Sequence, residues 1–130
     1  MSKPQQTMRT PLGKVRGLGS AKHGVGHFIT QRVSAVGLIF LVPWFLISLI
    51  GAVRGGYDGA LAWVADPINA VLTFLAVGTA LYHMRLGMQV VVEDYITKHS
   101  TKNLLLILNT FICVVLFAAA AYAVLKIAIS

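Results

Sequence analysis

Apolar residues are grouped along the chain in long blocks, with the charged residues between them. Three stretches contain no Asp, Glu, Lys or Arg, namely residues 33–53, 67–84 and 103–125. A bilayer core about 30 Å thick requires about 20 apolar residues in a helix. The first and third stretches meet that length and the second nearly does. The pattern therefore predicts an all-α integral membrane protein with three transmembrane helices, at about 27–53, 67–97 and 103–126.

Capping and breaking residues set the expected helix boundaries. Asp66 and Pro67 predict the start of the second helix, because Asp is a good N-cap and Pro is favoured at the first helical position. Pro43 interrupts the first helix and is expected to kink it, which a membrane helix tolerates when neighbours satisfy the freed carbonyl. A short polar loop over residues 98–102 is expected between the second and third helices.

A cluster of turn-forming residues follows the first predicted span. Gly55, Gly56, Asp58 and Gly59 predict a turn on the outer side of the membrane. Trp63, together with Tyr57, is expected to anchor this region at the outer interface, where aromatic rings are enriched.

Charge changes the picture by giving the helices an orientation. The net charge of +7 raises the possibility of nucleic-acid binding, but six basic residues precede the first charge-free stretch, residues 33–53, and only Arg54 and Lys126 lie on the opposite side. This positive-inside pattern predicts a cytoplasmic N-terminus and a periplasmic C-terminus. We expect residues 1–25 to form a basic cytoplasmic arm facing lipid headgroups or an acidic partner, and residues 26–130 to form the membrane anchor.

His83 is the only histidine inside a predicted span. It falls in the cytoplasmic half of the membrane, where an ionisable residue suggests function. Imidazole is a common haem and metal ligand, but a neutral histidine bonded to a neighbouring helix fits equally well. If haem is bound between two histidines, another chain must supply the second, because the remaining histidines lie at or outside the cytoplasmic boundary. These are His23, His27 and His99.

Three further residues follow His83 on the same helix. At about 100° per residue, Gly87 lies about 40° and Asp94 about 20° from His83 around the helix axis. His83, Gly87 and Asp94 therefore share one stripe of the helix surface. Gly87 would let a flat macrocycle lie close to the backbone, or would allow close packing of helices. Tyr95, beside Asp94, is either an interface anchor or a hydrogen-bond donor to the carbonyl of a buried ligand.

Two arginines and one cysteine complete the candidates. Arg85 lies within or at the edge of the hydrocarbon and must extend to the interface or pair with an anion, such as a haem propionate or a partner carboxylate. Arg32, at the start of the first helix, has the same choice, with a lipid phosphate as a further partner. Cys113 lies mid-span in the third helix, where a packing role is expected.

Two segments carry a family resemblance. Residues 83–95, His-Met-Arg-Leu-Gly-Met-Gln-Val-Val-Val-Glu-Asp-Tyr, resemble the signature of the small hydrophobic membrane-anchor subunit of succinate dehydrogenase, respiratory complex II. That signature has a histidine, a glycine four residues on, and Asp-Tyr at positions eleven and twelve. Residues 27–36, His-Phe-Ile-Thr-Gln-Arg-Val-Ser-Ala-Val, resemble the start of the family's first helix. The likeness covers roughly residues 15–128. Arg85 is a departure from the family pattern, because many relatives have an uncharged residue at that position.

The resemblance implies a role in electron transfer from succinate to ubiquinone. His83 would be one axial ligand of haem b, with the other on a sister cytochrome b anchor subunit. Tyr95 would hydrogen-bond ubiquinone beside Asp94, and Arg32 would lie near the haem propionates or the quinone pocket. An iron–sulfur subunit and a flavoprotein carrying FAD would dock on the cytoplasmic face of this chain. The membrane is expected to be the bacterial inner membrane and not the mitochondrial inner membrane. The lone chain would bind no nucleic acid and hold no catalytic residue.

Two alternatives remain open at this point. The chain could anchor a related quinone-reactive complex such as fumarate reductase, which differs in reaction direction. It could also be a haem-free structural membrane subunit in which His83 only packs.

Overall fold

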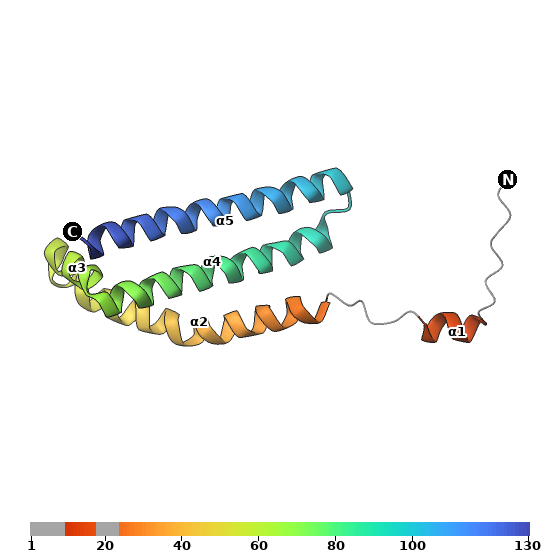
Figure 1. Ribbon diagram of the computed structural model, residues 1–130, viewed down its shortest axis with the longest axis horizontal. Helices are drawn as coiled ribbons and strands as arrows, with labels where there is room; N and C mark the ends of the chain where they lie inside the picture. Colours follow the sequence, from red (N-terminus) through yellow and green to blue (C-terminus); the bar gives the residue numbers. More distant parts are fainter. Residues whose placement is uncertain (1–9, 18–23) are drawn as a thin grey trace.

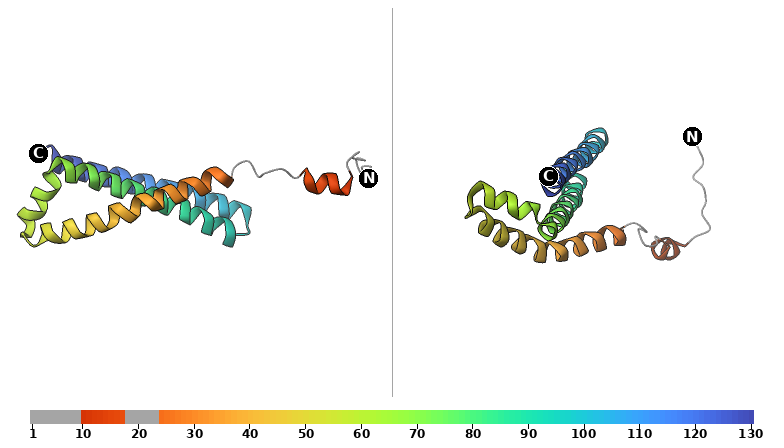
Figure 2. Two further views of the ribbon diagram at one scale, coloured as in Figure 1. Left: turned by 90° about the horizontal axis from the view of Figure 1, so that it is seen from below. Right: turned by 60° about the vertical axis from the view of Figure 1, so that its left-hand side comes forward.

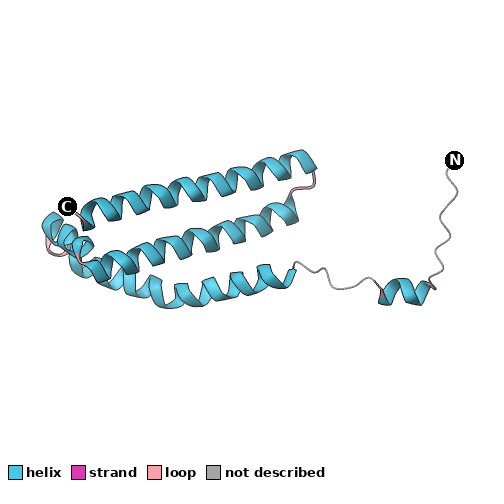
Figure 3. Ribbon diagram, viewed as in Figure 1, coloured by secondary structure: helices cyan, strands magenta, loops and turns pink. Residues whose placement is uncertain are grey.

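The computed structural model describes residues 10–17 and 24–130, which contain helices and no strand (Figure 3). The helices are α1 (Pro11–Arg16), α2 (Gly24–Val53), α3 (Gly56–Ala65), α4 (Pro67–Tyr95) and α5 (His99–Ala128). Three of them, α2, α4 and α5, have 29 or 30 residues and are long and apolar enough to cross a membrane. The prediction of an all-α protein with three transmembrane helices is therefore confirmed.

The three long helices run alternately up and down, with α4 in the middle (Figures 1 and 2). Helix α4 contacts both α2 and α5, whereas α2 and α5 make no direct contact with each other. The spans therefore form a layer rather than a closed bundle. The start of α2 and the α4–α5 connection lie at one end of this layer, and α3 and the C-terminus lie at the other.

Few side chains are buried within this layer. Seven described residues are buried, and five of these belong to α4: Ala70, Thr73, Ala76, Leu86 and Val92. Small residues at helix crossings are typical of membrane proteins, where close backbone approach replaces the hydrophobic effect as the source of association. The apolar faces of the layer remain available to lipid or to partner subunits.

The start of α4 follows the predicted capping chemistry. Asp66 has an extended backbone, and its side chain accepts a hydrogen bond of 3.0 Å from the backbone N–H of Asn69. Pro67 occupies the first helical position. This prediction is confirmed, and the cap fixes where His83 lies along α4.

The connection between α4 and α5 is shorter than predicted. Residues 99–102 were expected in a loop, but α5 begins at His99, and the backbone N–H of Lys102 donates to the Lys98 carbonyl at 2.9 Å. The Lys102 ammonium donates to the Glu93 carbonyl at 2.9 Å, which satisfies one of the free carbonyls at the end of α4. The prediction was wrong here because a polar first turn of a helix has the composition of a loop.

The region after α2 also differs from the prediction. Asp58 and Gly59 belong to helix α3 instead of a turn, which is confined to the residues around Gly55. Gly56 has φ of 71°, a backbone conformation that favours glycine. At Gly59 a Cβ atom would lie 2.7 Å from the Ala52 carbonyl oxygen, so this glycine allows α3 to cross close to the backbone of α2.

Helix α3 packs back against the layer and contacts α2, α4 and α5. Its Trp63 ring stacks on Trp44 with centroids 6.0 Å apart and meets Phe45 edge-on at 5.9 Å. Trp63 therefore has a packing role that the sequence did not indicate. Tyr57, the other predicted anchor, is 78% exposed. Helix α2 continues through Pro43 and is curved along its length (Figure 2).

Side-chain hydrogen bonds tie α4 to α5 within the membrane. The Arg85 Nε donates to Thr110 Oγ1 at 3.2 Å, and the Asn109 side-chain amide donates to the Arg85 carbonyl at 3.0 Å. Cys113 is 5% exposed, and its sulfur lies 3.8 Å from the Asn109 side-chain oxygen. The expected packing role of this cysteine agrees with its burial.

Replacement of Asn109 should weaken the contact between α4 and α5. Asn109→Ala removes the hydrogen bond to the Arg85 carbonyl and is expected to lower the free energy of unfolding by about 0.5–1 kcal/mol. Unfolding by dodecyl sulfate in mixed micelles, followed by circular dichroism, measures this loss. Asn103→Ala, at an exposed position in the first turns of α5, is the matched control. Equal stability of both variants would contradict the role of Asn109.

Candidate functional site

His83 is held in place by a side chain from another helix. Its Nδ1 lies 2.9 Å from the Ser34 hydroxyl oxygen, a contact that joins α4 to α2. Ser34 is 7% exposed and also donates to the Gln31 carbonyl at 3.0 Å. Among the described residues, hydrogen bonding of the ring involves Nδ1 alone, which leaves Nε2 uncommitted. The imidazole is thus oriented by α2 and retains one nitrogen for another partner.

A hollow of about 380 Å³ lies between α2 and α4 on the side of the His83 stripe toward the start of α2. Two of its lining residues carry buried polar atoms without a hydrogen-bond partner in the described part of the chain, His27 Nε2 and Gln31 Oε1. Buried polar atoms are normally paired, so such orphans call for a partner from outside. The full lining is Gly24, His27, Phe28, Gln31, Arg32, Gly87 and Val90.

Gly87 lines this hollow one turn beyond His83. A Cβ atom there would meet only the Gln31 side-chain amide nitrogen, at 3.9 Å, which is ordinary van der Waals contact. Gly78, farther along the same helix, is different, because a Cβ atom would lie 3.1 Å from the Phe117 ring. Packing within this chain therefore accounts for Gly78 but does not require glycine at position 87.

Arg32 lies on the wall of the same hollow with an exposed side chain. Its guanidinium lies 5.2 Å from the centre of the Phe28 ring, in a cation–π contact. Such a contact positions the cation without neutralising its charge. The structure thus brings Arg32 and Gly87 together, as a site for an anionic group would require.

Arg85 is placed apart from this hollow. Its Nε is engaged by Thr110 of α5, whereas His83 contacts Ser34 of α2. The groove of about 530 Å³ that Arg85 lines, between α4 and α5, shares no lining residue with the hollow around Gly87. The fold therefore separates Arg85 from the hollow that Arg32 and Gly87 line.

Asp94 and Tyr95 form the end of α4. Both are exposed, and the Tyr95 side chain is 80% exposed. Tyr95 is twelve residues beyond His83, which corresponds to about 18 Å along the helix axis. These two residues lie outside the hollow, on a surface that this chain leaves open.

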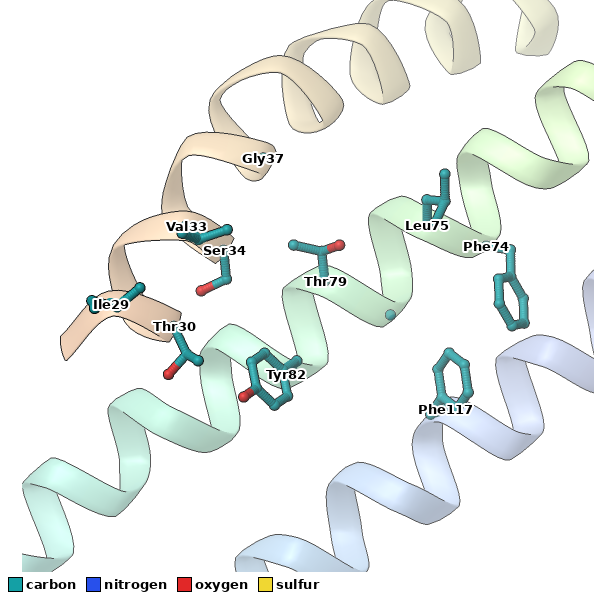
Figure 4. Close-up of a pocket in the computed structure, with 11 residues that line it drawn as sticks. Ile29, Thr30, Val33, Ser34, Gly37, Phe74, Leu75, Thr79, Tyr82 and Phe117 are labelled. Carbon is teal, nitrogen blue, oxygen red and sulfur yellow. The ribbon is translucent and has the colours of Figure 1, made fainter. Parts of the chain in front are cut away.

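A further groove of about 570 Å³ runs along α2 and α4 and reaches Phe117 of α5 (Figure 4). Its lining is mostly apolar, and Ser34 and Thr79 lie between the two helices. We place the candidate site at His83 and the smaller hollow, because two of the three buried side-chain polar atoms without a partner among the described residues line that hollow, and the third belongs to Thr73.

Sequence reasoning missed three residues of this site: Ser34, Gln31 and His27. A signal existed for Ser34, since it is one of only two hydroxyl residues in the apolar stretch 33–53, the other being Ser48. Which of the two faces His83 depends on how α2 crosses α4, and the sequence pattern alone does not give that crossing.

Fold and site together define a class of protein: a small integral membrane subunit with an oriented intramembrane histidine and with faces left open for partners. Residues 6–121 match the family described as the succinate dehydrogenase/fumarate reductase transmembrane subunit. The chain belongs to this family, as a hydrophobic membrane anchor subunit of the succinate dehydrogenase type.

Curated relatives named as hydrophobic membrane anchor subunits of succinate dehydrogenase support this assignment over nearly the whole chain. The Rickettsia bellii protein is 34% identical over 117 residues, which cover 88% of this chain and 94% of that protein. The Rickettsia conorii protein is 33% identical over 112 residues, covering 85% and 89%. The Paracoccus denitrificans protein is 32% identical over 117 residues, covering 90% of each. No solved structure matches the chain significantly.

The two glycines of α4 should respond differently to alanine. Gly87→Ala is expected to leave the free energy of unfolding unchanged or slightly raised, because the new methyl group meets no obstacle and alanine favours helix. Gly78→Ala should lower it by about 1 kcal/mol, because the Phe117 ring must shift. The same unfolding titration in mixed micelles compares them. An equal loss in both variants would mean that Gly87 is needed for contact between α2 and α4.

Proposed function

We propose that this chain anchors succinate:ubiquinone oxidoreductase in the membrane, supplies one axial ligand of haem b and forms part of the ubiquinone site. The observation that carries this proposal is the imidazole of His83, oriented by Ser34 through Nδ1 and free at Nε2. Membership in the anchor family supports association with the other subunits of an oxidoreductase complex.

The residues around His83 fit a haem group. Nε2 is the nitrogen by which histidine commonly binds haem iron when Nδ1 is hydrogen-bonded to a second residue. Gly87 leaves open space one turn away, and Arg32 provides a positive charge for a propionate. Bound haem would supply a one-electron carrier within the bilayer. The part of this chain would be to hold the iron, position the macrocycle and balance its carboxylates.

A second chain is needed to complete this haem site. Of the other described histidines, His27 lines the hollow near the start of α2, and His99 is exposed at the first residue of α5. Neither is level with His83 in the layer, because His27 lies near the start of α2 and His99 at the start of α5. The proposal therefore assigns the second axial ligand to a sister cytochrome b anchor subunit, packed on the open face of α2 and α4.

The quinone would bind at the end of α4. The Tyr95 hydroxyl is exposed at what the charge distribution predicts to be the cytoplasmic surface, and it can donate a hydrogen bond to a quinone carbonyl. The adjacent Asp94 carboxylate would shape the site and provide a route for protons. The iron–sulfur subunit would cover this surface and deliver electrons from a flavoprotein that carries FAD.

The bacterial relatives support a bacterial membrane protein, and we assign it to the inner membrane, where respiratory quinones are reduced. The curated relatives are named for succinate dehydrogenase, which favours succinate oxidation over the fumarate reductase alternative. The proposal differs from a haem-free structural role in a way that an optical spectrum can test.

Removal of the His83 side chain should abolish haem binding. In complex purified with His83→Ala, the reduced-minus-oxidised b-type absorption band is expected to fall to near zero, because one axial ligand is missing. His99→Ala, which changes an exposed histidine, should retain the band. Normal haem content in His83→Ala would refute the ligand role and favour the structural alternative.

Replacement of Tyr95 should separate quinone reduction from succinate oxidation. Tyr95→Phe removes one hydrogen bond to the quinone, so succinate–quinone turnover is expected to fall about tenfold, which corresponds to about 1.4 kcal/mol. Succinate oxidation with an artificial acceptor should continue, because that electron path ends before the quinone. Tyr57→Phe, at an exposed tyrosine near the opposite end of the layer, is the control. Unchanged quinone turnover in Tyr95→Phe would exclude the hydroxyl from the site.

A further inference from the structure

We propose that Ser34 is a positioning residue for the haem ligand: its hydroxyl oxygen accepts the Nδ1–H of His83, which fixes the tautomer and the ring orientation and leaves the Nε2 lone pair available to bind iron. This inference rests on the proposed haem function and extends it to a residue of another helix. It assigns to Ser34 a role in tuning the ligand as well as in packing.

The direction of the hydrogen bonds follows from the second partner of Ser34. Its oxygen lies 3.0 Å from the Gln31 carbonyl and 2.9 Å from His83 Nδ1. A carbonyl oxygen can only accept, so the single hydrogen of the hydroxyl is donated to Gln31. Ser34 then faces His83 with a lone pair, and Nδ1 must carry the hydrogen. In a neutral imidazole this leaves Nε2 unprotonated, as an iron ligand must be.

The burial of Ser34 between α2 and α4 stabilises its hydrogen bond with His83. Ser34 is 7% exposed and lies between α2 and α4, next to the mostly apolar groove of Figure 4. Water does not compete readily for a hydrogen bond in such a place, and the low local dielectric strengthens it. Among the described residues, this is the one side-chain hydrogen bond between α2 and α4. The ring orientation therefore depends on it.

Packing alone would make a different demand on position 34. One turn away, Gly37 faces Thr79, and a Cβ atom at position 37 would lie 3.7 Å from the Thr79 methyl group. A small residue at position 34 would serve such a crossing whether or not it carried a hydroxyl. Alanine would then replace Ser34 without effect on the haem, so the two roles make opposite predictions for one substitution.

Acceptance of the Nδ1–H increases the basicity of the imidazole. A more basic ligand donates more strongly to iron and favours the ferric over the ferrous state. Loss of the Ser34 hydroxyl should therefore raise the haem midpoint potential. Loss of an outer partner of this kind typically lowers metal affinity about 10- to 100-fold.

The experiment compares Ser34→Ala, Ser34→Thr and Ser48→Ala in the intact complex. Ser48 is the matched control, because its hydroxyl bonds only to the Trp44 and Phe45 carbonyls of its own helix. Three quantities are measured: the haem midpoint potential by redox titration, the electron paramagnetic resonance signal of the ferric haem, and the haem retained per flavin. In Ser34→Ala we expect a raised potential, a shifted ferric signal and at least tenfold weaker retention, with all three returning toward the wild-type values in Ser34→Thr and unchanged in Ser48→Ala.

Two outcomes would overturn the inference. One is a Ser34→Ala complex whose potential, ferric signal and haem retention equal those of Ser48→Ala. The other is loss of haem in Ser34→Ala that Ser34→Thr does not restore, since the defect would then not be due to the missing hydroxyl. Haem loss in Ser34→Ala with recovery in Ser34→Thr supports it. The result for His83→Ala keeps the two proposals separate: if that variant loses haem while Ser34→Ala behaves as the control, the ligand role stands and only the role of Ser34 fails.

Discussion

A polar contact in an apolar environment is the interaction on which the candidate site depends. The 2.9 Å contact between Ser34 and His83 joins α2 to α4 where Ser34 is 7% exposed, so water has little access to its hydroxyl group. An imidazole left unpaired there would be costly, so the crossing of the two helices and the orientation of the ring are fixed together. The same contact occupies Nδ1 of His83 and leaves Nε2 without a hydrogen bond among the described residues. A hydrogen bond that joins two helices can therefore also orient a nitrogen that remains able to bind a ligand.

The arrangement of the helices explains why this chain acts only as part of an assembly. Because α2 and α5 do not contact each other, they flank α4 on its two edges, and of the other described helices only α3 contacts it. Few of the described side chains are buried, and the hollow around Gly87 contains polar atoms that no described residue pairs. In the membrane, lipid can cover apolar faces, but it cannot satisfy buried amide and imidazole groups. A partner that brings polar groups to the His83 side of α4 would complete both the packing and the hydrogen bonding.

Sequence reasoning succeeded where a single segment determines the outcome. The three spans follow from the distribution of charge, and the start of α4 follows from the chemistry of Asp66 and Pro67. It failed where the outcome depends on which segments meet. Gly59 has the composition of a turn residue, but its lack of a side chain serves the crossing of α3 over α2. The contacts of Ser34 with His83 and of Arg85 with Thr110 likewise depend on how the helices cross. A periodic pattern of hydrophobic residues does not specify these crossings.

Gln31 connects the two parts of the proposed site. Its backbone carbonyl accepts the hydrogen of Ser34, which in turn accepts from His83, while its side chain lines the hollow and carries one of the buried oxygens without a partner. The hollow is also lined by Arg32 and by other residues near the start of α2, and the start of α2 lies at the same end of the layer as the end of α4, which carries Tyr95. In the proposed function, the haem carboxylates and the quinone would thus both lie at the end of the layer where α2 begins and α4 ends. The Ser34 contact uses the backbone carbonyl of Gln31, which any residue at position 31 would provide, whereas the lining of the hollow depends on the side chain. A substitution at position 31 would therefore change the hollow and leave the acceptor of the Ser34 hydroxyl in place.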